Sequence, residues 1–203
     1  FDKEYLRLLR EILNNGVEVE NRTGINTIKI PEFHFSFDLN YEFPILQTKQ
    51  MFYRQAVTEM LWIWQMGSND VRELHERNVH IWDEWMVDSD GIYRIYEPSG
   101  EYDPDKEVEV LDPLSTPVDN PFGELKPKYD ETGKVMTTKG LIEGKTIKSA
   151  KYYGKEFAYT IGTAYGFITN RYQHARNLIN TIKNNPTDRR MVKSLWQDEF
   201  LRT

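Results

Sequence analysis

A glutamate in an otherwise apolar stretch is the first residue whose surroundings could give it chemistry. If residues 53–66 form a helix, the positions three and four away from Glu59 are mostly apolar: Gln55, Ala56, Trp62 and Ile63. Burial among such residues raises the pKa of a carboxyl group toward the range useful for proton transfer. A glutamate at a helix edge that reaches solvent or pairs with an arginine has the same spacing, so both roles stay open.

The segment His80-Ile81-Trp82-Asp83-Glu84-Trp85 places two tryptophans three residues apart. On a helical turn their rings lie on one side, where large rigid rings form good walls for a flat ligand. Packing into the core is the commoner explanation of such a pair, so both roles stay open. The adjacent carboxylates of Asp83 and Glu84 diverge and make a poor acid/base pair.

Arginines form the third candidate group. Arg189 and Arg190 follow Pro186, and Arg22 lies far away in the sequence. The guanidinium fork matches the oxygens of a phosphate bidentately, which makes arginine a natural phosphate clamp. Ordinary surface charge remains the alternative for such a pair.

Metal and nucleotide-cradle signals are weak. His75 and His80 are five residues apart, which differs from the i, i+4 spacing of helical metal pairs, and we identify no third ligand nearby. We therefore expect no metal site. The sequence contains no Gly-x-Gly-x-x-Gly and no Walker loop, which disfavours dinucleotide and triphosphate sites.

The elements that position these residues follow from periodicity. Helical spacing predicts helices over residues 3–14, 53–66 and 171–184, the second apolar nearly all round. Alternation predicts strands over 33–39 and 191–196.

Residues 91–160 differ from the rest of the chain. They hold six of the nine prolines and seven of the twelve glycines. We expect an inserted region of loops and short hairpins within a single domain over residues 1–203. Its five lysines between 139 and 155 favour a solvated face, with a phosphate or polyanion contact as the minority alternative.

Composition excludes several classes. The 203 residues carry 26 basic and 32 acidic side chains, a net charge of −6, which argues against sequence-blind nucleic-acid binding. Runs of about 18 apolar residues are absent from the sequence, so we expect no membrane span. Without cysteine, the chain has no disulfide, thiolate zinc site or thiol nucleophile.

Taken together and in order, six segments resemble successive landmarks of the thymidylate synthase family. They are Arg22-Thr23-Gly24, Leu46-Gln47-Thr48-Lys49, Glu59-Met60-Leu61-Trp62, Ile81-Trp82-Asp83-Glu84-Trp85, Ala164-Tyr165-Gly166 and Asn185-Pro186-Thr187-Asp188-Arg189-Arg190. The resemblance covers residues 3–90 and 160–200. It implies an α+β fold with a large twisted mixed β-sheet covered by helices, in a cytoplasmic homodimer.

The implied activity is reductive methylation of dUMP to dTMP, with 5,10-methylenetetrahydrofolate giving both carbon and hydride. By resemblance, Arg22 would bind the substrate phosphate, and Arg189 and Arg190 would reach the phosphate of the partner subunit. Catalytic roles would fall to Glu59, which organises a proton-transferring water network, and Tyr165 beside it. The residues expected to bind folate are Lys49, Ile81, Trp82 and Trp85.

The family's chemistry needs a cysteine thiolate. By resemblance that cysteine follows a proline a short way beyond residues 196–201, so we expect it past Thr203 and expect the chain alone to be inactive. Two alternatives stay open: a pyrimidine-nucleotide hydroxymethylase of the same superfamily, and a non-catalytic relative that binds nucleotide.

Overall fold

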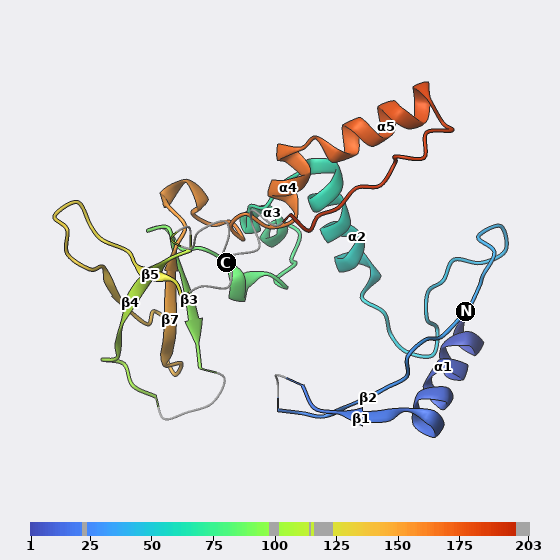
Figure 1. Ribbon diagram of the computed structural model, residues 1–203, viewed down its shortest axis with the longest axis horizontal. Helices are drawn as coiled ribbons and strands as arrows, with labels where there is room; N and C mark the ends of the chain where they lie inside the picture. Colours follow the sequence, from blue (N-terminus) through green and yellow to red (C-terminus); the bar gives the residue numbers. More distant parts are fainter. Residues whose placement is uncertain (22–23, 98–101, 114, 116–123, 198–203) are drawn as a thin grey trace. The chain divides into compact units, whose positions relative to one another are not determined.

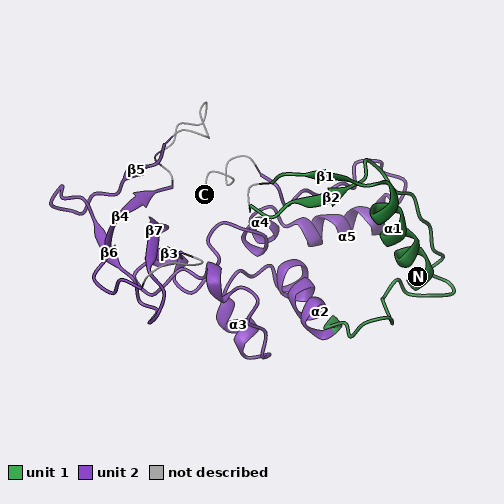
Figure 2. Ribbon diagram, turned by 90° about the horizontal axis from the view of Figure 1, so that it is seen from below, with its two compact units in different colours: residues 1–53 green, residues 54–203 purple. Residues whose placement is uncertain are grey.

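The computed structural model describes residues 1–21, 24–97, 102–113, 115 and 124–197 (Figure 1). The chain divides into two compact units, residues 1–53 and 54–203, coloured green and purple in Figure 2. Within the described residues, helices long and apolar enough to cross a membrane are absent. Two statements stay predictions: that residues 1–203 form one catalytic domain, and that residues 91–160 vary within a family.

The first unit combines a helix with a small antiparallel ribbon. Helix α1 (Asp2–Asn15) confirms the predicted helix and is followed by β1 (Val17–Val19) and β2 (Thr27–Lys29). The Asp2 carboxylate accepts the backbone N–H groups of Gln47 and Thr48, each at 2.9 Å. These bonds lower the pKa of Asp2 and fix the chain just before Lys49.

The predicted strand over 33–39 is wrong. Its phenylalanines still share one side, with ring centroids of Phe35 and Phe37 6.0 Å apart and Phe1 5.8 Å from Phe37. A strand needs a neighbour for its backbone N–H and C=O groups. In the described part of the chain, residues 33–39 have no paired strand, so the alternation yields an aromatic cluster without a ladder.

In the second unit, the predicted helix over 53–66 is confirmed. It consists of α2 (Tyr53–Leu61) and a π-helical turn, η1 (Trp62–Met66). Helix α3 (Val71–His75) and the 3₁₀ turn η2 (Asp83–Trp85) follow. One apolar core joins η1 and α3 to the chain around residues 79 and 161; it consists of Trp62, Ile63, Val71, Leu74, Val79 and Ile161.

The predicted helix over 171–184 is confirmed as α5 (His174–Asn184). Helix α4 (Gly166–Arg171), which was not predicted from the sequence, comes directly before it. Between them Gln173 has a left-handed φ of 51°, which interrupts the helix. The predicted strand over 191–196 is wrong. That segment is instead held by side-chain contacts, among them His174 Nε2 at 3.1 Å from the carbonyl oxygen of Ser194.

Residues 91–160 contain a five-stranded sheet, so the prediction of loops and short hairpins is only partly right. Its strands are β3 (Ile92–Tyr96), β4 (Glu107–Asp112), β5 (Lys126–Pro127), β6 (Thr137–Lys139) and β7 (Ile147–Tyr152), followed by the 3₁₀ turn η3 (Lys155–Phe157).

The strand order is β3-β7-β4-β5, with β6 paired to β4. Strand β7 is antiparallel to β3 and parallel to β4, which makes the sheet mixed. A second apolar core supports it, made of Ile92, Val110, Ile147 and Ala150. The mixed sheet with its helices confirms the predicted α+β fold.

Candidate functional site

Glu59 and Trp82 meet across two elements. The indole Nε1–H of Trp82 donates to Oε1 of Glu59 at 2.9 Å, and both side chains are half-buried. Glu59 comes from α2, and Trp82 directly precedes η2. The carboxylate therefore lies against an indole rather than at a freely solvated helix edge.

Aromatic rings continue from this contact. The Trp82 ring centroid lies 5.3 Å from that of Trp85, edge to face, and 5.3 Å from that of Tyr165. These three rings line a cavity of about 370 Å³. The structure thus brings together four of the residues proposed from the sequence, since Glu59 is one hydrogen bond away from the cavity wall.

The remaining walls come from the first apolar core, from the sheet and from the segments next to them. They are formed by Val87, Tyr93, Ile95, Lys151, Tyr153, Ile161 and Ala164. A second cavity of about 850 Å³ lies between η2, β3 and residues 141–146, and Trp85 and Tyr93 line both. Strands of the 91–160 region therefore form part of the candidate site.

Lys151 is a residue that sequence reasoning missed. Burial lowers its pKa, and burial together with the charge of Glu84 raises the pKa of Tyr93. The other four lysines between 139 and 155 are exposed, as predicted for a solvated face, whereas Lys151 is half-buried. Alternation along β7 places Lys151 on the face of Ile147, but this signal exists only once β7 is known to be a strand.

Tyr165 is held by a strained turn and a close backbone contact. Its φ is 41°, a value that costs energy in a residue other than glycine. The next residue, Gly166, starts α4, and a Cβ on it would lie 1.5 Å from the carbonyl oxygen of Ser68. Only glycine allows α4 to begin this close to the turn after η1, and this contact positions the Tyr165 ring.

Backbone hydrogen bonds join the two sides of the cavity. The N–H of Val71 donates to the carbonyl of Tyr159 at 2.9 Å, and that of Ile161 to Asn69 at 3.1 Å. On the other side, the N–H of Val87 donates to Thr160 at 2.9 Å. Residues 159–161 therefore connect the segment that carries Trp82 and Trp85 to the chain that leads into Tyr165.

Three other proposed residues of the second unit, Ile81, Arg189 and Arg190, do not line this cavity. Ile81 is exposed and is not among its lining residues, and Lys49 is exposed in the first unit. Arg22 lies outside the described residues. Arg189 and Arg190 are exposed beyond α5.

Arg190 has a local partner. Its backbone N–H donates to Oδ1 of Asp188 at 2.8 Å, and its guanidinium Nε–H donates to the same oxygen at 3.2 Å. These bonds lower the pKa of Asp188. The contact orients the Arg190 guanidinium, and the Arg190 side chain remains 85% exposed.

Comparisons with known proteins bear on the family of the chain. A family model described as thymidylate synthase matches residues 3–203. The chain is similar to the thymidylate synthase of Clostridium beijerinckii, 32% identical over 201 residues that cover 99% of this chain and 50% of that protein. The thymidylate synthase of Brachyspira hyodysenteriae is 29% identical over 196 residues, 96% of this chain and 50% of that protein.

A third relative matches a shorter part of the chain. The thymidylate synthase of Bacillus phage phi3T is 39% identical over 106 residues, 47% of this chain and 38% of that protein. The chain spans about half the length of the curated relatives that it matches over nearly its whole extent. With the family match over residues 3–203, these similarities show that the chain belongs to the thymidylate synthase family.

Proposed function

We propose that this chain supplies part of the active site of an enzyme that methylates dUMP to dTMP, with 5,10-methylenetetrahydrofolate as donor. Family membership supports the reaction class. The observation that carries the proposal is the bond from Trp82 to Glu59 beside an aromatic-walled cavity of about 370 Å³.

Glu59 is proposed to hold and pass protons around the pyrimidine ring. A carboxylate has several acceptor sites, so the Trp82 bond fixes its orientation and leaves capacity for a substrate or water. Half-burial of Glu59 against the Trp82 indole limits competing water, which strengthens a proton-transferring contact. Tyr165, whose ring packs on Trp82, is proposed to act beside it.

Trp82 and Trp85 are proposed to form the flat walls for the folate ring system, with Ile81 extending the apolar surface. The folate supplies a one-carbon unit and a hydride. The residues present fit such a group, since the rings of Trp82, Trp85 and Tyr165 line a cavity that also presents one cation, Lys151. Lys151 is suited to an anionic group of the bound ligands, and Lys49 is proposed for the acidic tail of the folate.

Three arginines are proposed to bind the phosphate of dUMP. Arg189 and Arg190 present exposed guanidinium groups whose forks match phosphate oxygens. In a homodimer they would serve the partner subunit's site, and Arg22 would serve its own. The homodimer and a cytoplasmic location rest on the family resemblance.

Covalent trapping tests the proposal. The chain contains no cysteine, so the thiolate that attacks the pyrimidine is not among its residues, and the experiment uses the product of the intact gene. Incubation with 5-fluorodeoxyuridylate and methylenetetrahydrofolate should give a covalent ternary adduct by mass spectrometry. Nucleotide binding without adduct would instead identify a non-catalytic relative.

Product analysis separates the enzymatic alternative. With dUMP and methylenetetrahydrofolate, dTMP is the expected product, and a hydroxymethylated nucleotide would identify a hydroxymethylase. Glu59→Gln should lower kcat by about 10²–10⁴-fold, the usual contribution of a general acid or base. The same substitution should leave dUMP binding within a few-fold of wild type, since the amide oxygen still accepts from Trp82.

Subunit mixing tests the arginines. Arg190→Ala and Glu59→Gln are each expected to be nearly inactive alone. Mixed dimers would contain one site with neither substitution if Arg190 acts in trans, so mixing should restore activity. Failure to restore it, with subunit exchange confirmed, would contradict the trans role and leave the reaction class untouched.

A further inference from the structure

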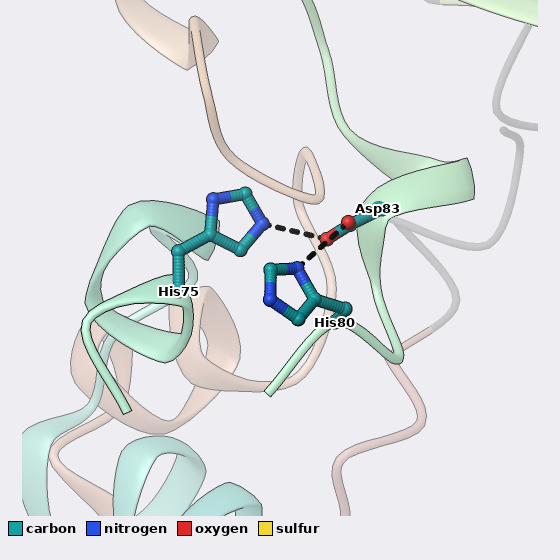
Figure 3. Close-up of side chains that lie close together, drawn as sticks. All are labelled: His75, His80 and Asp83. Atoms are coloured by element: carbon teal, nitrogen blue, oxygen red, sulfur yellow. Dashed lines mark hydrogen bonds and ion pairs between the residues drawn. The ribbon is translucent and has the colours of Figure 1, made fainter. Parts of the chain in front are cut away.

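Two histidines and an aspartate that do not line the cavity of about 370 Å³ converge on one point (Figure 3). We propose that His75, His80 and Asp83 bind a divalent transition-metal ion of the zinc class. This inference goes beyond the proposed methyl transfer, which uses none of the three side chains.

The geometry of the three ligand atoms carries the proposal. His75 Nε2 lies 2.6 Å from Asp83 Oδ1, and His80 Nδ1 lies 3.1 Å from Asp83 Oδ2. All three ligand atoms lie within 4.8 Å of one another. Zinc bonds of about 2.0–2.2 Å in a tetrahedral site separate ligand atoms by about 3.3 Å, so small side-chain rotations would suffice.

The backbone brings these residues together through a tight turn. Helix α3 ends near His75, and Asn78 then adopts a left-handed φ of 55°. The N–H of Val79 returns to the carbonyl of Leu74 at 3.0 Å. The turn stacks the His80 ring on the His75 ring, with centroids 4.8 Å apart and planes 25° from parallel.

This turn explains why the sequence favoured no metal site. The five-residue spacing of the histidines is unsuitable on a continuous helix, but the chain leaves the helix between them. Asp83, the third ligand, enters from the start of η2. Spacing alone carries no sign of this arrangement.

The support beneath the turn is rigid. Val71, Leu74 and Val79 are at most 2% exposed and anchor the backbone on both sides of His75. The side chain of Asp70 caps α3 by accepting the N–H of Arg72 at 3.0 Å. Ligands on a fixed backbone need little ordering when an ion binds, which favours affinity.

The donor set selects the class of ion. Imidazole nitrogens suit Zn²⁺, Ni²⁺, Cu²⁺ and Fe²⁺, whereas Mg²⁺ and Ca²⁺ prefer oxygen ligands. The Asp83 carboxylate supplies a compensating negative charge. The side chains of His75, His80 and Asp83 are 33%, 55% and 43% exposed, so an ion can enter and keep water in its remaining positions.

Calorimetric titration of the full-length, untagged and metal-stripped protein with Zn²⁺ tests the proposal. The measure is the difference between wild type and variants, because other parts of the protein could also bind zinc. Wild type should bind one more Zn²⁺ per chain than His80→Ala or Asp83→Asn, or bind it at least about 10-fold more tightly. Titration with Mg²⁺ should show no corresponding difference.

Two matched controls accompany these variants. His34→Ala removes another exposed histidine, and Glu84→Gln removes the exposed carboxylate next to Asp83. Neither should change zinc binding. Bound Co²⁺ should give wild type a visible absorption spectrum of mixed nitrogen and oxygen ligands, which His80→Ala loses.

Equal zinc stoichiometry and affinity in wild type and His80→Ala would overturn the proposal, as would equal loss in His34→Ala. Far-UV circular dichroism checks the fold of each variant. Because His80 is exposed, its alanine variant is expected to fold, and it decides the outcome if Asp83→Asn does not.

Discussion

Removing the indole donor of Trp82 should measure what its bond to Glu59 contributes. A hydrogen bond to an ionised group contributes about 1.5–3 kcal/mol. Both side chains are half-buried, so water replaces part of the bond when it is lost, and the lower end, about 1.5 kcal/mol, is expected. Trp82→Phe also loses ring contacts with Trp85 and Tyr165, so the single variant alone overstates the bond.

A double-mutant cycle isolates the pairwise contribution. Trp82→Phe, Glu59→Met and the double variant are unfolded in urea and followed by far-UV circular dichroism, because one substitution removes a fluorophore. The double variant should be about 1.5 kcal/mol more stable than the sum of the single losses predicts. In a chain of this size that coupling corresponds to about 3–6 °C in Tm.

A matched cycle provides the control. Trp196 is 72% exposed, and Trp196→Phe combined with Glu59→Met should be additive. A coupling below about 0.5 kcal/mol between Glu59 and Trp82, within the scatter of independent sites, would refute the reasoning that their bond holds the carboxylate in place.

Three further predictions concern stability and pH. Gly166→Ala should lower the free energy of unfolding in urea by about 3 kcal/mol, because the added Cβ would lie 1.5 Å from a backbone oxygen. Gly144 has open space around it but a φ of 78°, so Gly144→Ala should lower it by only about 1–2 kcal/mol. Lys151→Met should raise Tm at pH 7, because burial opposes the charged form of the lysine, and it should weaken ligand binding in calorimetry. As the pH rises from the lowered pKa of Lys151 toward 10.5, the free energy of unfolding should increase in wild type but not in this variant. The Arg72 guanidinium lowers the pKa of Asp70, so the stability that this contact contributes is present above pH 3.8 and is lost as the pH falls through the lower folded-state pKa. Asp70→Asn keeps a capping side chain, and its free energy of unfolding should fall less steeply in acid titrations followed by circular dichroism.

Each of these has a contrary outcome. Equal losses in the two glycine variants would mean that the turn facing Gly166 yields at little cost. A lower Tm in Lys151→Met would show that the ammonium group is stabilised where it lies. An acid transition identical in wild type and Asp70→Asn would assign that loss to other carboxylates.

Local signals were sufficient for the longer helices but not for α3, α4 or the sheets. Helical periodicity alone identifies α1, α2 with η1, and α5, because each helix satisfies its own backbone bonds. Alternation over 33–39 suggested a strand, but a strand also needs a neighbour, which sequence spacing cannot supply. In the sheet of residues 91–160, β3 pairs with β7 across more than fifty positions of sequence. The many prolines and glycines of this region predicted loops and gave no sign of this pairing.

The candidate site was likewise predictable only where its residues lie in segments with a clear local pattern. Glu59 and Trp82 lie in short segments with helical spacing, and the structure brings them together. Lys151 could not be separated from its exposed neighbours before its strand was known. His75 and His80 come together because Asn78, after α3, has a left-handed conformation. The spacing of the histidines does not predict that conformation.

The position of β7 has a consequence for protein engineering. This strand lies between β3 and β4, and Lys151 on β7 lines the same cavity as Tyr93 and Ile95 on β3. Deleting the region to obtain a smaller protein would therefore remove a wall of the cavity together with the loops. A chimera that receives residues 91–160 from another relative would exchange this wall of the cavity along with the transplanted strands.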